Sequence, residues 1–156
     1  MKLDALDLRI LAELQQDCGI SNVELARKVH LSPSPCLTRV KALESNGFIL
    51  RYVALADPKA LGLGLNVFIS ISLKAQTKES LAEFELCIVE HDEVMECYLM
   101  TGDSDYLIRV AVADIGALEK FILNNLSPIP GIEKIRSSFA LKQVRYKTAL
   151  PLQTVV

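Results

Sequence analysis

Residues 21–47 read SNVELARKVHLSPSPCLTRVKALESNG, a pattern that predicts two short helices joined by a tight turn. Ser21 and Glu24 have the spacing of a capping box, in which the hydroxyl accepts a hydrogen bond from the amide of residue 24 and the carboxylate reaches back. The apolar side of this helix is formed by Val23, Leu25, Ala26 and Val29. Capping signal and apolar spacing together predict a helix that begins at Ser21.

The turn and the second helix are indicated by two Ser-Pro pairs. We expect residues 31–33 to form the turn, because the residue before a proline is pushed out of the helical region. Ser34 and Pro35 then fit the N-cap and the first position of the next helix. Its core side is predicted at Leu37, Val40 and Leu43. Gly47 has the place of the glycine that commonly follows a helix end.

This arrangement is typical of a helix-turn-helix, whose second helix enters the major groove of DNA. We expect Ser34 and Thr38 to contact phosphates or base edges, and Arg39 to bond a guanine. The full predicted set of DNA-binding residues is Ser32, Ser34, Pro35, Thr38, Arg39, Lys41 and Arg51. The alternative is an ordinary amphipathic helix in a small bundle.

The charge distribution favours DNA although the chain as a whole carries a net charge of −2. Between residues 27 and 51 the only carboxylate is Glu44, against the cations Arg27, Lys28, Arg39, Lys41 and Arg51, a local charge of +4. Such a focused patch can bind phosphates even on an acidic protein. Residues 48–53 are predicted to be extended, as a wing or linker strand that carries Arg51 toward the DNA backbone.

Composition excludes several classes of protein. Half of the 156 residues are hydrophobic, so the chain can bury a core, yet no run approaches the ~20 apolar residues of a membrane span. The N-terminus lacks the apolar segment of a secretory signal, so we expect a cytoplasmic protein without membrane contact. The four cysteines and two histidines are scattered, so neither a metal site nor a cofactor is expected.

The remainder of the chain predicts a second domain. Residues 65–74 alternate apolar and polar side chains as a strand does, and further strands are predicted at 94–101, 106–113 and 132–146. Helices are predicted at 77–90 and 115–126. The order βαββαβ predicts a ferredoxin-like sandwich with both helices on one face of an antiparallel sheet. Apolar groups on the other face lead us to expect a second copy of the chain there.

The predicted fold class is therefore α+β, a winged helix-turn-helix domain followed by a ferredoxin-like sandwich. A further helix after Asp4 completes the first domain, because apolar residues recur there at helical spacing. The predicted boundaries are 1–53 for the DNA-binding domain, 54–64 for the linker and 65–156 for the second domain.

The motifs LSPSPCLTRVKALESNG, MTGDSDYLIRV and RSSFALKQVRYKTALPL resemble the leucine-responsive/asparagine-regulator (Lrp/AsnC) family of transcription factors over essentially the whole chain. Residues 93–110 and 135–152 look similar to the branch that regulates branched-chain keto acid dehydrogenase operons. The resemblance implies a double-stranded DNA operator, an amino-acid effector bound between subunits, and a homodimer that assembles further, commonly into an octamer.

The resemblance also implies where the effector binds, near a Gly-Asp-x-Asp loop and the last strand. The residues carried over are Met100, Thr101, Gly102, Asp103, Asp105 and Tyr106, with Ser138, Phe139 and Ala140. Asp103 and Asp105 could accept hydrogen bonds from an ammonium, while Met100 and Phe139 could line an apolar pocket. The alternative is a hairpin turn in which Asp and Gly serve turn geometry alone.

Three functions are compared. The leading one is a transcriptional regulator of amino-acid metabolism whose amino-acid effector, a branched-chain one favoured, changes DNA binding. The second is an architectural DNA-wrapping protein that needs no effector. An enzyme is not expected, because Asp103 and Asp105 have no catalytic partner and no nucleophile stands beside a base.

Overall fold

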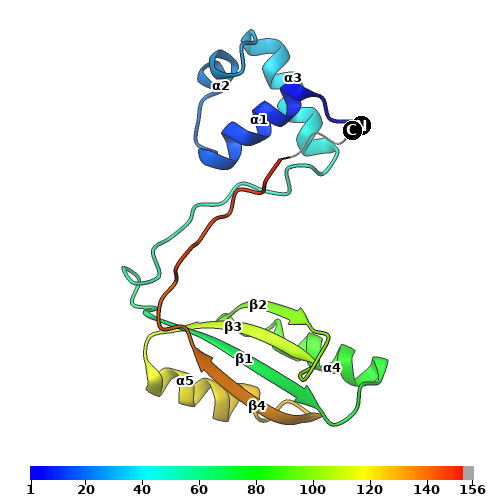
Figure 1. The fold of residues 1–156 in the computed structure, drawn as a ribbon, viewed down its shortest axis with the longest axis vertical. Helices are drawn as coiled ribbons and strands as arrows, with labels where there is room; N and C mark the ends of the chain where they lie inside the picture. The colour runs from blue at the N-terminus through cyan, green and yellow to red at the C-terminus, as the bar shows by residue number, and fades with distance from the viewer. Residues whose placement is uncertain (153–156) are drawn as a thin grey trace. The chain divides into compact units, whose positions relative to one another are not determined.

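The computed structural model describes residues 1–152, and the chain forms two compact units. The first is Met1–Leu55, with which the segment that begins at Val144 is grouped, and the second is Ala56–Gln143. Figure 1 shows the two units and the connecting segments. No helix in the described part of the chain is long and apolar enough to cross a membrane.

The first unit contains three helices, α1 (Ala5–Gln16), α2 (Asn22–Lys28) and α3 (Pro33–Ser45). Their shared core consists of Ile10, Leu11, Leu25, Ala26, Val29, Cys36 and Leu43. Ser21 accepts a 3.2 Å hydrogen bond from the amide of Glu24, which confirms the predicted cap of α2. The reciprocal bond is absent there, because the Glu24 carboxylate binds Arg27 instead. A complete capping box stands at the start of α1, between Asp4 and Asp7.

The start of α3 was predicted two residues too late. Its N-cap is Ser32 and its first residue is Pro33, since a proline fits the first helical position at 33 as well as at 35. The core side is also rotated: Cys36 is fully buried, whereas Leu37 is 43% exposed. The end of the helix is confirmed, because Gly47 has a φ of +75° directly after the C-cap residue.

The predicted wing strand at 48–53 is wrong, since these residues form no strand. The amides of Phe48 and Ile49 both donate to the carbonyl of Leu43, so the chain first closes the end of α3. A strand needs a partner for its backbone groups, and within residues 1–152 no strand pairs with this segment.

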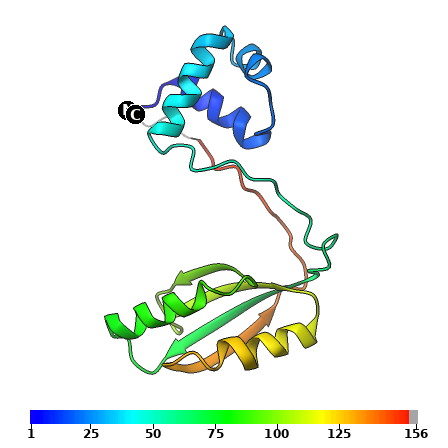
Figure 2. The ribbon, with the colours of Figure 1, turned by 180° about the vertical axis from the view of Figure 1, so that it is seen from behind.

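The second unit contains β1 (Leu65–Leu73), α4 (Lys78–Ile88), β2 (Val94–Leu99), β3 (Tyr106–Val112), α5 (Ile115–Phe121), the π-helical turn η1 (Ile122–Leu126) and β4 (Ile132–Phe139). The strands form one antiparallel sheet in the order β2-β3-β1-β4, which confirms the predicted ferredoxin-like topology. Helices α4 and α5 cover the same face, as the two opposite views in Figure 1 and Figure 2 show.

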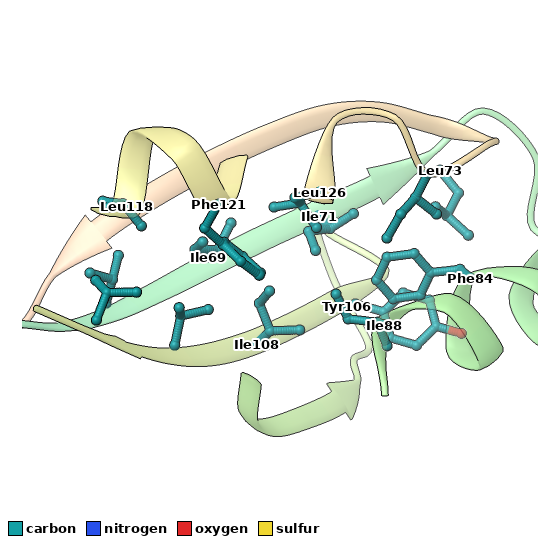
Figure 3. Packing of buried hydrophobic residues seen from close by; sticks show 14 residues of the cluster. Ile69, Ile71, Leu73, Phe84, Ile88, Tyr106, Ile108, Leu118, Phe121 and Leu126 are labelled. Atoms are coloured by element: carbon teal, nitrogen blue, oxygen red, sulfur yellow. The ribbon is translucent and has the colours of Figure 1, made fainter. Parts of the chain in front are cut away.

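The core of this unit lies between the sheet and its helices, as Figure 3 shows. Alternate residues of β1 and β3 are buried there, together with Phe84 and Ile88 of α4 and Leu118 and Phe121 of α5. The face of the sheet away from the helices is called the open face below. It carries the intervening residues, among them Phe68, Ser70, Ser72, Leu107, Arg109, Lys134 and Arg136.

The last strand ends at Phe139, which pairs with Val67, and not at residue 146 as predicted. Strand β1 begins only two residues before Val67, at Leu65, so it has no residues with which 142–146 could pair. The second compact unit ends at Gln143, which differs from the predicted domain 65–156. In the first unit, the amide side chain of Gln15 both donates to and accepts from the backbone of Leu150. Residues 153–156 of the predicted domain lie outside the described residues.

Candidate functional site

The exposed surface of α3 carries most of the predicted DNA-binding residues. Ser34, Pro35, Thr38 and Lys41 are all exposed, on one helix of a helix-turn-helix. The turn before α3 is fixed by Asn22, whose side-chain amide donates a 2.8 Å hydrogen bond to the carbonyl of Pro33. This bond ties the first residue of α2 to the first residue of α3 and so sets the angle at which α3 is presented.

The N-terminus of α3 is open to a ligand. The N-cap residue Ser32 is exposed, and its hydroxyl makes no capping hydrogen bond. The amide of Ser34 therefore stands free at the positive end of a 13-residue helix. Such an end binds phosphate groups readily.

Most cations of the predicted patch are paired. Arg27 binds Glu24, and Lys28 lies 2.7 Å from Glu13. Of the five cations, Lys41 and Arg51 alone form no ion pair with a described residue. The local charge of +4 therefore overstates the field of this surface, because the neutralising carboxylates belong to residues that precede the counted window.

We predicted that Arg39 lies free on the outer side of α3, and the structure shows that it does not. Its guanidinium donates to Asp7 at 2.7 Å and to Asp4 at 2.8 Å, the two residues of the α1 capping box. Hydrogen bonds to these carboxylates raise the pKa of Arg39 above its usual value. The structure thus gives Arg39 a positioning role between α1 and α3.

In the second unit, the Gly-Asp-x-Asp loop connects β2 to β3. Gly102 has a φ of +123°, a conformation that only glycine adopts readily. Asp103 is exposed, while Asp105 is buried and already occupied: its carboxylate accepts from the amide of Leu73 at 2.7 Å and from the side chain of Gln76 at 2.6 Å. Both oxygens of Asp105 are therefore already engaged within the second unit, whereas the sequence prediction treated this acid as a free acceptor.

Tyr106 is also placed differently from the prediction. Its ring is buried against Phe84 on the helix-covered face, and its hydroxyl donates a 2.8 Å hydrogen bond to Glu85. Burial and this hydrogen bond raise the pKa of Tyr106. The side chain belongs to the core and does not reach the loop surface.

The two halves of the predicted effector site lie at opposite ends of the sheet. The loop precedes Tyr106, which pairs with Ile71, whereas Phe139 pairs with Val67. Four residues of β1 separate these positions, a distance of about 13 Å along a strand. Loop residues Met100–Asp105 and the segment of Ser138, Phe139 and Ala140 therefore form no common pocket within one protomer.

Sequence reasoning missed a pocket that the loop does form. A cavity of about 250 Å³ lies on the open face, lined by Ser70, Ser72, Asp103, Ser104, Lys134 and Arg136. The signal was present in β4, where Lys134 and Arg136 flank Ile135. Alternation with an apolar residue places both cations on one face of the sheet.

Comparison with known families covers both units. Residues 3–49 match a family model described as a winged helix-turn-helix DNA-binding domain, and residues 66–150 match the Lrp/AsnC ligand binding domain. The chain belongs to the Lrp/AsnC family. The family membership confirms the resemblance and fold class predicted from the sequence.

Individual Lrp/AsnC relatives are similar over nearly their full length. The Bkd operon transcriptional regulator of Pseudomonas aeruginosa is 46% identical over 97% of this chain and 99% of its own. The leucine-responsive regulatory protein of Escherichia coli is 40% identical over 97% of this chain and 93% of its own. A transcriptional regulator of Neisseria meningitidis in complex with L-Met has a TM-score of 0.95 at 38% identity, covering 99% and 100% of the two chains.

The Lrp/AsnC domain boundaries differ from the compact units. The winged helix-turn-helix match stops at residue 49 and leaves Arg51 outside. The ligand-binding match continues to residue 150, so it includes residues 144–150, which the structure groups with the first unit. The C-terminal segment is thus shared between the family's second domain and the fold of the first.

Proposed function

We propose that this protein is a sequence-specific DNA-binding transcriptional regulator of amino-acid metabolism, modulated by a small amino acid. Its two family matches carry the proposal, because one is a DNA-binding domain and the other a ligand-binding domain. The similarity to the Bkd operon regulator favours a branched-chain amino acid as the effector. No reaction is proposed, since the relatives are regulators.

The DNA surface is the outer side of α3 with its N-terminus. Ser32 and Ser34 stand where backbone phosphates would meet the free helix end. Thr38 and Lys41, one and two turns further along, face outward and reach the groove or its edges. Arg51 adds a phosphate contact from the segment after α3, and Arg39 holds α3 against α1.

Lys41 and Arg51 are the cations of this patch that form no ion pair with a described residue. One DNA-binding domain, called a head below, therefore offers few phosphate contacts. Several heads acting together are therefore needed for tight binding. A homodimer supplies two heads for two half-sites about 34–36 Å apart, and an octamer would supply more. Apolar residues Phe68 and Leu107 on the open face support a second copy at that face.

The effector is proposed to bind at the loop of residues 100–105 where subunits meet. In one protomer, Phe139 lies at the far end of the sheet from this loop, so a second copy is required to bring residues 138–140 to it. An effector placed between copies shifts their equilibrium if it binds one assembly better than another. That shift changes how many heads engage an operator together.

The test is a thermal-shift screen of the full chain against the twenty amino acids. A ligand that binds the folded state raises its melting temperature. A rise with leucine, isoleucine or valine supports the proposal, and a rise with another amino acid keeps the regulator but changes its effector. A flat screen at millimolar concentrations would favour the architectural, effector-independent alternative.

A further inference from the structure

We infer that the outer face of α4 binds a basic amphipathic helix of another protein. This outer face consists of Ala82, Leu86 and Val89, which are exposed on the side of α4 that points away from the sheet. Because α4 and α5 cover the face of the sheet opposite the open face, a second copy on the open face does not cover this surface (Figure 1, Figure 2). The inference adds a protein partner to the proposed regulator and does not rest on the identity of the effector.

Helix α4 carries apolar residues on two of its sides. Its inner side packs Phe84 and Ile88 into the core, where both are fully buried. Ala82, Leu86 and Val89 follow one another at intervals of four and three residues, so they form a second stripe on the other side. Leu86 is 71% and Val89 is 67% exposed, and Val89 keeps a helical backbone with a φ of −73° and a ψ of −13°. A helix that is apolar on both sides is typical of one packed between two partners.

The outer stripe is held in place by contacts on the inner side of α4. The helix begins at a cap, because the hydroxyl of Thr77 accepts a 3.2 Å hydrogen bond from the amide of Ser80. Further along, the carboxylate of Glu85 accepts a 2.8 Å hydrogen bond from the hydroxyl of Tyr106. The rings of Tyr106 and Phe84 pack with their centroids 4.4 Å apart, as Figure 3 shows. A partner therefore meets a preformed surface, which lowers the entropic cost of binding.

The surroundings of this stripe are strongly acidic. Residues 78–93 carry a net charge of −5, from the single cation Lys78 and the acids Glu79, Glu83, Glu85, Glu90, Asp92 and Glu93. None of these side chains forms an ion pair with a described residue. Glu79 and Glu83 each stand three residues before a member of the stripe, so they lie beside it on the helix surface. The apolar stripe is therefore bordered by carboxylates that are free to pair with cations of a partner.

These charges decide which partner fits the outer face of α4. A second copy that presented the same face would bring two acidic surfaces together, and like charges across an interface oppose association. DNA phosphates and anionic lipid surfaces are repelled for the same reason. A helix with an apolar stripe between lysines or arginines matches both features, because its stripe packs against residues 82, 86 and 89 while its cations pair with the carboxylates.

The test is fluorescence anisotropy of the full chain with a labelled synthetic peptide of ~18 residues, long enough to form a helix, at physiological salt. The peptide carries leucines at helical spacing with lysines beside them, and a scrambled peptide of the same composition keeps the charge without the stripe. We expect the patterned peptide to bind roughly tenfold or more tightly than the scrambled one. The variant Leu86→Gln/Val89→Gln should lose that preference. Ile115→Gln, which changes an apolar side chain on α5 that is 69% exposed, is the matched control and should bind as wild type.

Glu79→Gln/Glu83→Gln should weaken binding of the patterned peptide severalfold and reduce its dependence on salt. Equal affinity of the wild type for the two peptides, or unchanged affinity in Leu86→Gln/Val89→Gln, would overturn the inference and leave the proposed function standing. Sedimentation velocity without peptide tests the other occupant: a smaller assembly in Leu86→Gln/Val89→Gln than in wild type would give the face to a second copy and also overturn the inference. Because both side chains are exposed, we expect the melting temperature of this variant to match the wild type. Should it fall, Leu86→Ala/Val89→Ala replaces the variant in each measurement.

Discussion

The guanidinium of Arg39 lies 2.7 Å from the carboxylate of Asp7, a side chain that is 3% exposed. The same nitrogen binds Asp4 at 2.8 Å, so one arginine of α3 holds both acids of the α1 capping box. A buried carboxylate needs a partner, because leaving it unpaired costs far more than an exposed ion pair contributes. The orientation of α3 therefore depends on α1 through Arg39.

Replacing Arg39 with Ala should destabilise the first unit by about 2 kcal/mol, since Asp7 is left buried without its charge-assisted hydrogen bond. Hydrogen exchange of amides in α1 and α3 measures this locally. Lys41→Ala, which removes an exposed cation of the same helix, is the matched control and should leave exchange unchanged. Normal stability of Arg39→Ala together with lost DNA affinity would return Arg39 to the set of base-reading residues.

Lys41→Ala and Arg51→Ala should each weaken DNA binding to a similar extent on all sequences. Both residues are exposed and unpaired among the described residues, so each can neutralise a phosphate. Each lost phosphate contact lowers the slope of log affinity against log salt by about 0.9 per head. Arg27→Ala, whose side chain is bound to Glu24, serves as the control. An unchanged slope in both variants would place the phosphate contacts elsewhere.

Asp105→Asn and Asp103→Asn should differ in their effect on the stability of the second unit. The first turns one acceptor oxygen of a buried side chain into a donor facing Leu73 or Gln76, and should destabilise the second unit by about 2 kcal/mol. The second changes an exposed side chain and should leave the melting temperature unchanged. The comparison uses thermal denaturation without ligand. Equal melting temperatures for the two variants would show that Asp105 does not brace the loop.

Lowering the pH should destabilise the second unit, because Glu96 becomes protonated and loses its ion pair with Arg109. Hydrogen bonds from Arg109, at 2.9 and 2.7 Å, lower the pKa of this carboxyl below its usual 4.5. A lowered folded-state pKa means that the stabilisation is present above about pH 4.5 and is lost as the pH falls through the folded-state value. Glu96→Gln should therefore flatten the acid limb of stability against pH. An identical limb in wild type and variant would assign the acid sensitivity to other carboxyls.

The fold was predictable because its signals are local. Strand β1 places Val67, Ile69 and Ile71 on one face. Its other face carries three polar residues and Phe68, so the period of two, with one apolar exception, indicates which face is buried. The start of α3 was not predictable, since Pro33 and Pro35 satisfy the same rule for the first helical position. A local rule cannot choose between two positions that both obey it.

The candidate site was less predictable, because the arrangement of its side chains depends on partners that are distant in the sequence. Arg39 looks like any exposed arginine until α1 folds against α3, 32 residues away in the chain. The sequence gives no reason to treat Asp103 and Asp105 of the same turn differently, yet only Asp105 is bound, by the end of β1 at Leu73 and by Gln76 in the loop before α4. Lys134 carried a usable signal in its alternation with Ile135, but its neighbour Ser72 became known only with the strand register.

The most direct test of coupled DNA and effector binding is a DNA titration of the full chain. A duplex chosen by selection from random sequences is titrated with and without saturating L-leucine, isoleucine or valine at fixed salt. We predict a change in DNA affinity of roughly 5–150-fold, the usual range of allosteric coupling, and an equal change in amino-acid affinity when DNA is present. Superimposable DNA-binding curves for all twenty amino acids would contradict an effector-controlled regulator.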